Sequence, residues 1–172
     1  MNEAVLWDSV MPSHQDVPPQ GETSENASLA SDRHRGQQDT PRLVLDTNVF
    51  VAAGFNPRSS SARILERVRE GSWTMAWNRD TRRETEAVLA QIPPLSGRSA
   101  EAAFFPEAEV TAQTHPERFS LIEDPDDRKF AALAAVADAI LVTNDDHLLS
   151  QRDRMEVEVL TPGELMARYG QG

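Results

Sequence analysis

The stretch Leu43-Val44-Leu45-Asp46-Thr47-Asn48 decides the fold of this 172-residue chain. Three apolar residues run directly into a carboxylate and two small polar residues. The apolar part is typical of a buried strand, and the polar part places a carboxylate at that strand's carboxyl end. Open α/β sheets bind their ligands at this edge. A second such ending, Ile140-Leu141-Val142-Thr143-Asn144-Asp145, lies downstream, so we expect two acids at one edge.

Strand and helix signals alternate along most of the chain. We predict strands over 42–46, 73–77, 119–122, 139–142 and 157–160, and helices over 60–70, 78–91, 98–113, 126–136, 146–149 and from 162 onward. This alternation predicts an α/β fold with a doubly wound parallel sheet flanked by helices. Trp73, Met75 and Trp77 alternate on one face of their strand and are expected in the core, with a base-stacking platform as the alternative.

Composition narrows the class of protein. There are no cysteines, which excludes disulfides and thiolate zinc sites and suits the cytoplasm. No apolar run approaches the roughly 20 residues of a membrane span. The net charge of −11 argues against a broad, charge-driven nucleic-acid binder. Residues 1–40 are rich in proline and polar residues and are expected to form a flexible acidic tail, followed by one domain over 41–172.

Four acids occupy comparable positions in the predicted fold. Asp46 and Asp145 follow strands, and Glu84 and Asp127 lie near the starts of helices. In a parallel sheet these places face one rim, so the four carboxylates could converge there. A hard divalent cation, Mg²⁺ or Mn²⁺, would relieve their mutual repulsion. Each acid also has a simpler explanation as a helix-terminal or turn residue.

The chain resembles the PIN-domain nucleases. The segments that carry the resemblance are 43–50, 84–89, 124–134 and 141–149, together with 159–165, which is similar to the subgroup of toxins from toxin–antitoxin pairs (VapC-like). The resemblance covers residues 42–165. The sequence departs from the subgroup at position 147, where an Asp is common and this chain has His147. This difference puts a second metal ion in doubt. Glu86 is a second acid close to Glu84 in the sequence. Glu84 is preferred because it lies four residues before a Val-Leu pair, as the acid of the family's motif does.

The resemblance implies a PIN-like three-layer α/β/α fold and a metal-dependent endoribonuclease. Asp46, Glu84, Asp127 and Asp145 would be the catalytic and metal-binding acids. The partners it implies are an RNA substrate, a cognate antitoxin and a second copy of the chain in a homodimer.

Other side chains are candidates for support of the acids or for substrate binding. The resemblance implies that the Asn48 amide orients the acids, and the alternative is that Asn48 caps the next helix. Thr143 could place its hydroxyl at the metal or be a plain strand residue. The candidates for substrate binding are the cations beside the acids: Arg82, Arg83, Arg128 and Lys129, with Arg58 further away.

Two other functions stay open. The chain could be a non-catalytic RNA- or protein-binding module that keeps the fold. It could also be a phosphatase with Asp46 as nucleophile, although such enzymes usually carry a second acid where Asn48 stands.

Overall fold

The computed structural model describes residues 40–97 and 100–171 of the chain. These residues belong to one compact unit, 38–172. The predicted tail over 1–40 lies outside the described residues except for Thr40.

A four-stranded parallel sheet forms the centre of this unit, with the strand order β2-β1-β3-β4. The strands are β1 (Arg42–Leu45), β2 (Thr74–Met75), β3 (Ile140–Val142) and β4 (Val159–Leu160). Leu45 on β1 is in register with Val142 on β3. Because β2 adds to one side of β1 and β3 to the other, the switch point of the fold lies between β1 and β3. Ligands of open α/β sheets bind outside this point.

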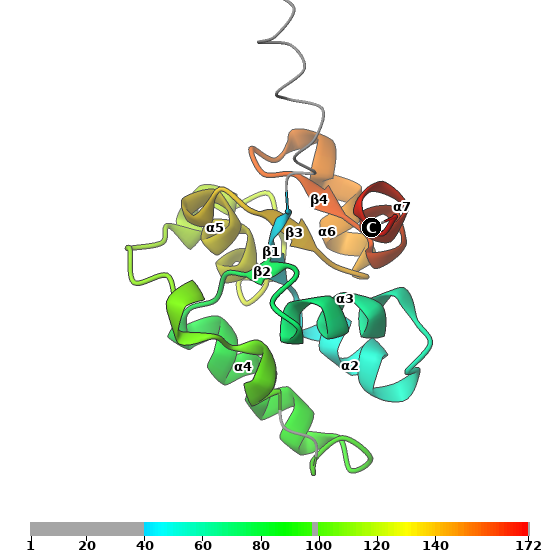
Figure 1. Ribbon diagram of the computed structural model, residues 1–172. Helices are drawn as coiled ribbons and strands as arrows, with labels where there is room; N and C mark the ends of the chain where they lie inside the picture. Colours follow the sequence, from blue (N-terminus) through cyan, green and yellow to red (C-terminus); the bar gives the residue numbers. More distant parts are fainter. Residues whose placement is uncertain (1–39, 98–99, 172) are drawn as a thin grey trace, which may run out of the picture. The chain divides into compact units, whose positions relative to one another are not determined.

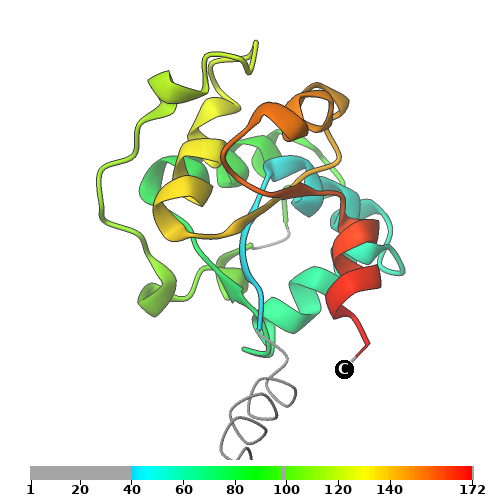
Figure 2. The same cartoon turned by 90° about the horizontal axis from the view of Figure 1, so that it is seen from above.

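Two layers of helices cover the sheet, as predicted. Leu43 and Leu45 pack in one core cluster and Val44 in the other, so β1 is buried on both faces. The first cluster contains residues of α2 (Thr47–Phe55), α3 (Ser60–Arg69), α4 (Arg79–Gln91) and α7 (Pro162–Tyr169). The second contains residues of α5 (Arg128–Ala137) and α6 (Asp146–Gln151). Figures 1 and 2 show α5 on one side of the sheet and α2, α3 and α7 on the other.

Local capping signals set the ends of several helices. The Asn78 side chain accepts a hydrogen bond from the Thr81 backbone and completes a capping box at the start of α4. Thr161 and Glu164 form the predicted capping box of α7. Gly71 follows α3 with φ of 73°, a left-handed conformation that glycine adopts without steric cost.

Helix α2 was not predicted from the sequence. Its residues, TNVFVAAGF, are apolar on nearly every side, so the segment lacks the periodicity that marks an amphipathic helix. Asp46 caps it by accepting a hydrogen bond from the Asn48 backbone. The alternative in which Asn48 is the cap is therefore wrong.

Two predicted elements are absent from the part of the chain that the structure describes. The segment 98–113 is not one helix; within it lie short 3₁₀ turns at Glu101–Ala103 and Pro106–Ala108, and residues 98–99 are not described. Pro106 has no N–H to donate and keeps Phe105 extended. The predicted strand 119–122 is a turn after the 3₁₀ segment Pro116–Phe119.

The start of α5 differs from the prediction in a way that matters for the site. The Asp124 side chain accepts a hydrogen bond from the Asp126 backbone and forms a turn, so the helix begins at Arg128 rather than at 126. Asp127 is the residue just before the helix, and its side chain makes no capping hydrogen bond. Its carboxylate is therefore not used to cap α5.

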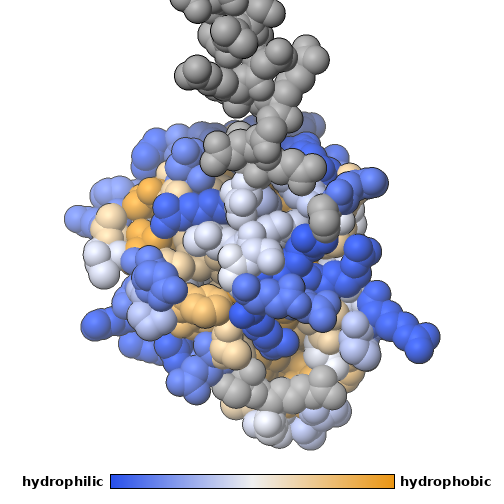
Figure 3. All heavy atoms as spheres, viewed as in Figure 1, coloured by the Kyte–Doolittle hydropathy of each residue, from blue (hydrophilic) through white to orange (hydrophobic). Residues whose placement is uncertain are grey.

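Polar residues dominate the surface of the described part. Figure 3 shows one face that is mostly hydrophilic with small apolar areas. Among the described residues, Phe55 and Val136 are the large apolar side chains that are well exposed. The rest of the large apolar side chains are buried or partly buried, as expected for a protein with a packed core.

Candidate functional site

Asp46 lies at the switch point and is held there by three hydrogen bonds. The residue is only 5% exposed. Its Oδ2 atom accepts hydrogen bonds from Thr143 Oγ1 at 2.6 Å and from Asn48 Nδ2 at 2.7 Å. Its Oδ1 atom accepts a longer one, 3.4 Å, from the Asn48 backbone. A buried carboxylate with this many donors has one orientation, so the end of β1 presents a fixed acid.

Thr143 joins the ends of β1 and β3. Its side chain is fully buried, and its hydroxyl donates to Asp46 while accepting from Asn48 Nδ2 at 3.2 Å and from the Asp145 backbone at 2.9 Å. One hydroxyl thus uses its single donor and both acceptor positions. The Asn48 amide oxygen accepts from the Asn144 backbone at 3.0 Å. Asn48 and Thr143 therefore link the two strand-end loops that carry Asp46 and Asp145.

The electrostatics of the acids show that they lie close together. Burial raises the pKa of Asp46, and the charges of Asp145 and Glu84 raise it further against the hydrogen bonds from Thr143 and Asn48, which lower it. Burial also raises the pKa of Asp127, and with the charges of Asp46, Asp124, Asp145 and Glu84 that pKa reaches about 6. Like charges have this effect only at short range. Asp145 and Glu84 therefore lie near enough to Asp46 and to Asp127 for their charges to act on both.

The neighbours of these acids face other partners. Glu86 is exposed and pairs with Arg82 at 2.8 Å, so Glu84 is the acid of α4 that faces the others. Asp145 caps α6 by accepting from the His147 backbone at 2.7 Å, and the His147 residue is exposed. The capping explanation is therefore correct for Asp145, but its charge still reaches Asp46 and Asp127.

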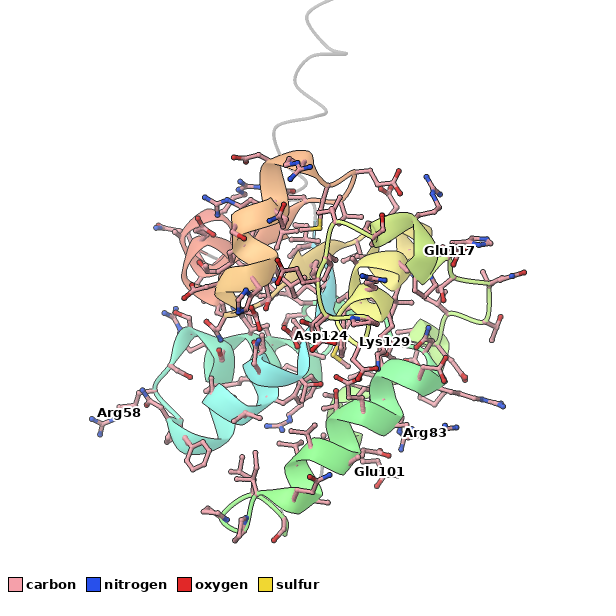
Figure 4. All side chains as sticks on the ribbon, turned by 180° about the vertical axis from the view of Figure 1, so that it is seen from behind. Arg58, Arg83, Glu101, Glu117, Asp124 and Lys129 are labelled. Atoms are coloured by element: carbon pink, nitrogen blue, oxygen red, sulfur yellow. The ribbon has the colours of Figure 1, made fainter. Side chains whose placement is uncertain are left out.

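Lys129 brings one cation into this group of acids. Its ammonium group pairs with Glu84 Oε2 and lies 3.5 Å from Asp126 Oδ1. Figure 4 shows Lys129 on α5, on the side that faces α4. The side chains of Arg58 and Arg83 extend outward in the same view.

The remaining candidates for substrate binding contact the protein itself. Arg82 lies over the rings of Trp77 and Phe104, at 5.4 and 5.2 Å from the ring centres. Arg128 donates to the backbone oxygen of Ile122 at 2.8 Å and so supports the loop before α5. Trp73, Met75 and Trp77 are buried, which confirms the core prediction and leaves no open ring face for base stacking.

The donor chemistry suits a hard divalent cation, but the side chains are not arranged as a ready-made ligand set. Mg²⁺ prefers oxygen ligands such as carboxylates, and its charge offsets the repulsion between them. Yet in residues 40–97 and 100–171 no group of three or more His, Cys, Asp or Glu side chains is placed to hold a metal ion. One Glu84 oxygen is taken by Lys129. In the described residues the predicted metal pocket is therefore a cluster of acids whose oxygens do not form a ligand set.

One contact near the site was missed by sequence reasoning. Thr47 Oγ1 and Thr85 Oγ1 are buried and lie 3.1 Å apart in a hydrogen bond. Each threonine follows an acid of the cluster, so the bond fixes the start of α2 against α4. The available signal was the spacing of Thr81, Thr85 and Leu89, which form one buried face of α4.

Within the described ranges, no helix has both the length and the apolar character needed to cross a bilayer.

Comparisons with known proteins agree with this architecture. The family model for the PIN domain matches residues 42–147. The chain is also 26% identical over 141 residues to the uncharacterized protein MJ1680 of Methanocaldococcus jannaschii, covering 74% of this chain and 91% of that protein. No solved structure shows a significant match. The family match spans the strand ends and helices that carry all four acids, and the chain belongs to the PIN domain family.

Proposed function

We propose that this protein is a divalent-metal-dependent endoribonuclease and the toxin of a toxin–antitoxin pair. Membership of the PIN domain family supports nuclease chemistry in general. The raised pKa of both Asp46 and Asp127, with the charges of Asp145 and Glu84 acting on each, is the observation that carries the proposal. An acid whose pKa is raised by the fold costs stability when it is ionised, and acids of this kind cluster at functional sites.

Asp46, Glu84, Asp127 and Asp145 would hold the ion. When bound, Mg²⁺ or Mn²⁺ supplies a Lewis acid that stabilises negative charge on a phosphoryl oxygen and aids the ionisation of water. Thr143 and Asn48 keep Asp46 oriented toward the site, since their hydrogen bonds use the Oδ2 atom. At neutral pH Asp127, with a pKa of about 6, is mostly ionised and able to bind a cation.

The proposed reaction is hydrolysis of an RNA phosphodiester bond. A water oxygen attacks phosphorus, the bond between phosphorus and the 3′ oxygen breaks, and the 3′ oxygen takes up a proton. The products are a 5′-phosphate and a 3′-hydroxyl. Single-stranded loops are the substrates we propose, because their unstacked bases can enter a groove at a sheet edge. The net charge of −11 means that RNA binding must depend on the cation and on local arginines such as Arg83.

Cleavage of a mixed RNA pool tests the activity. The full chain is incubated with the pool in Mn²⁺ or Mg²⁺, with and without EDTA, alongside Asp46→Asn and Glu86→Gln. We expect cleavage that EDTA and Asp46→Asn abolish and Glu86→Gln leaves intact, because Glu86 pairs with Arg82 outside the cluster. Circular dichroism checks that each variant is folded. Cleavage that persists in folded Asp46→Asn would overturn the proposal.

A non-catalytic binding module is the second candidate. The pairing of Glu84 with Lys129, and the lack of a ready-made ligand set in the described segments, favour it. Calorimetric titration with Mn²⁺ separates the two functions. A module of this kind gives no heat of binding even at millimolar metal, whereas the nuclease binds the ion.

The toxin assignment and the homodimer are proposals that rest on the likeness of the motifs to the toxin subgroup. A cognate antitoxin would be encoded by a small neighbouring reading frame. Co-expression of the two should give a stable complex, and light scattering of the purified chain should give twice its mass of 19.1 kDa. Failure of the chain to bind the neighbouring product would remove the toxin assignment and leave the nuclease proposal standing.

A further inference from the structure

Lys129 is the one lysine of the chain, and its side chain is less exposed than those of several arginines that form ion pairs in the described residues. Its side chain is 22% exposed, and the Glu84 side chain that it contacts is 24% exposed. The other ion pairs with Arg at the surface involve more open groups, such as Arg118 with Glu156. The pair of Lys129 and Glu84 therefore lies in a partly desolvated place, where charge interactions are stronger than at an open surface.

The ammonium group of Lys129 contacts two carboxylates. It pairs with Glu84 Oε2 and lies 3.5 Å from Asp126 Oδ1. One of these two acids, Glu84, also acts on Asp127 through its charge. The ammonium group therefore occupies the position of a monovalent counter-ion in a cluster that needs positive charge.

We propose that Lys129 is a tethered counter-ion that competes with the divalent cation for Glu84. This inference rests on the proposed function, since it concerns the affinity of the same acids for metal. An ammonium group on Glu84 Oε2 repels a divalent ion that binds the same carboxylate, whichever of the two oxygens the ion uses. Binding of the ion is therefore favoured when Lys129 turns away from Glu84.

The competition explains a feature of the site that the acids alone do not explain. The charges of Asp145 and Glu84 act on Asp46 and Asp127, yet the described side chains form no group ready to hold a metal. Lys129 stabilises the metal-free protein by neutralising part of the repulsion, and its ammonium group occupies one oxygen of a candidate ligand. Metal affinity is lowered as a result, so the protein responds to the divalent-ion concentration instead of binding the ion permanently.

Calorimetric titration of the full chain with Mn²⁺ tests this role without measuring activity. Lys129→Met removes the competing charge and should tighten Mn²⁺ binding by about tenfold, from a unit charge acting on a divalent ion at roughly 5 Å in a water-like dielectric. Lys129→Gln, which keeps a donor for Glu84 without a charge, should give a smaller gain. The matched control is Arg118→Met, which removes a paired cation away from the cluster and should leave the affinity unchanged.

A double-mutant cycle with Glu84→Gln identifies the site of competition. The gain from Lys129→Met should shrink when Glu84 no longer has a charge, because the two cations then have no shared ligand. An equal gain in both backgrounds would contradict competition for Glu84 and indicate only a general charge effect. Wild-type binding that Lys129→Met and Lys129→Gln leave unchanged would overturn this inference and leave the proposed function standing. Absence of Mn²⁺ binding in every variant would overturn both.

Discussion

Replacing Thr143 with valine tests how the site holds its buried acid. The hydroxyl donates to Asp46 Oδ2 at 2.6 Å and accepts from Asn48 and from the Asp145 backbone. Valine keeps the shape of threonine but removes all three bonds. The hydrogen bond to the charged Asp46 contributes about 2 kcal/mol. The bonds from the Asn48 amide and the Asp145 backbone add only about 1 kcal/mol together, because these partly exposed donors can bond to water instead. Thr143→Val should therefore lower the free energy of unfolding by about 3 kcal/mol at neutral pH.

The pH dependence separates the charged hydrogen bond from simple packing. Burial raises the pKa of Asp46, so its ionised form costs stability as the pH rises through that pKa, and the Thr143 bond limits this cost. The loss in Thr143→Val should therefore be full above the pKa of Asp46 and shrink as the pH falls below it, where the carboxyl group is protonated.

Urea denaturation at neutral and at acidic pH provides the measurement. Thr143→Ser is the control, since it keeps the hydroxyl and loses one methyl group, at a cost of about 1 kcal/mol. The reasoning is refuted if valine and serine at this position destabilise the protein equally at neutral pH. It is also refuted if the loss in the valine variant is the same in acid.

Three further predictions concern the other side chains of the site. Asp127→Asn should raise the midpoint of thermal unfolding at neutral pH, because the raised pKa means that ionised Asp127 costs stability as the pH rises through about 6; no gain at neutral pH would contradict this cost. At metal concentrations below saturation, RNA cleavage should fall as the pH drops below about 6, where protons compete with the ion for Asp127, and a pH–rate profile that stays flat through this range would exclude the role of that acid. Thr85→Val should destabilise the protein by about 1 kcal/mol in urea denaturation, because it breaks the buried bond to Thr47, whereas an unchanged midpoint would show that the bond contributes nothing.

Much of the fold could be predicted because its signals are local. The capping box at Thr161 and the cap at Asn78 depend on residues within one turn of the helix. The apolar runs that become β1 and β3 were recognised from their composition alone. Helix α2 was missed because it is apolar on nearly all sides, and a buried helix of this kind has no periodicity to detect. The order of the strands was not predicted, since pairing between distant segments leaves little trace in one sequence.

Some features of the site could likewise be predicted from local sequence signals, and others depend on how the helices pack. Asp46 and Asp145 could be placed from the ends of two strands, because parallel strands end at one edge of the sheet. The choice between Glu84 and Glu86 could not be made on physical grounds, since it depends on how α4 is rotated against the sheet. The pairing of Lys129 with Glu84 joins residues 45 positions apart and depends on the packing of α4 beside α5. Only the folded structure reveals that one candidate ligand already has a cation as its partner.

Crystals of the full chain grown with Mn²⁺ would test most directly whether the four acids share an ion. Anomalous diffraction locates manganese without any assumption about activity. We expect one strong peak at the switch point between β1 and β3, bonded to Asp46 and to at least two of Glu84, Asp127 and Asp145, with Lys129 turned away from Glu84. Manganese found only on carboxylates outside this cluster, or no peak at saturating metal, would contradict the account.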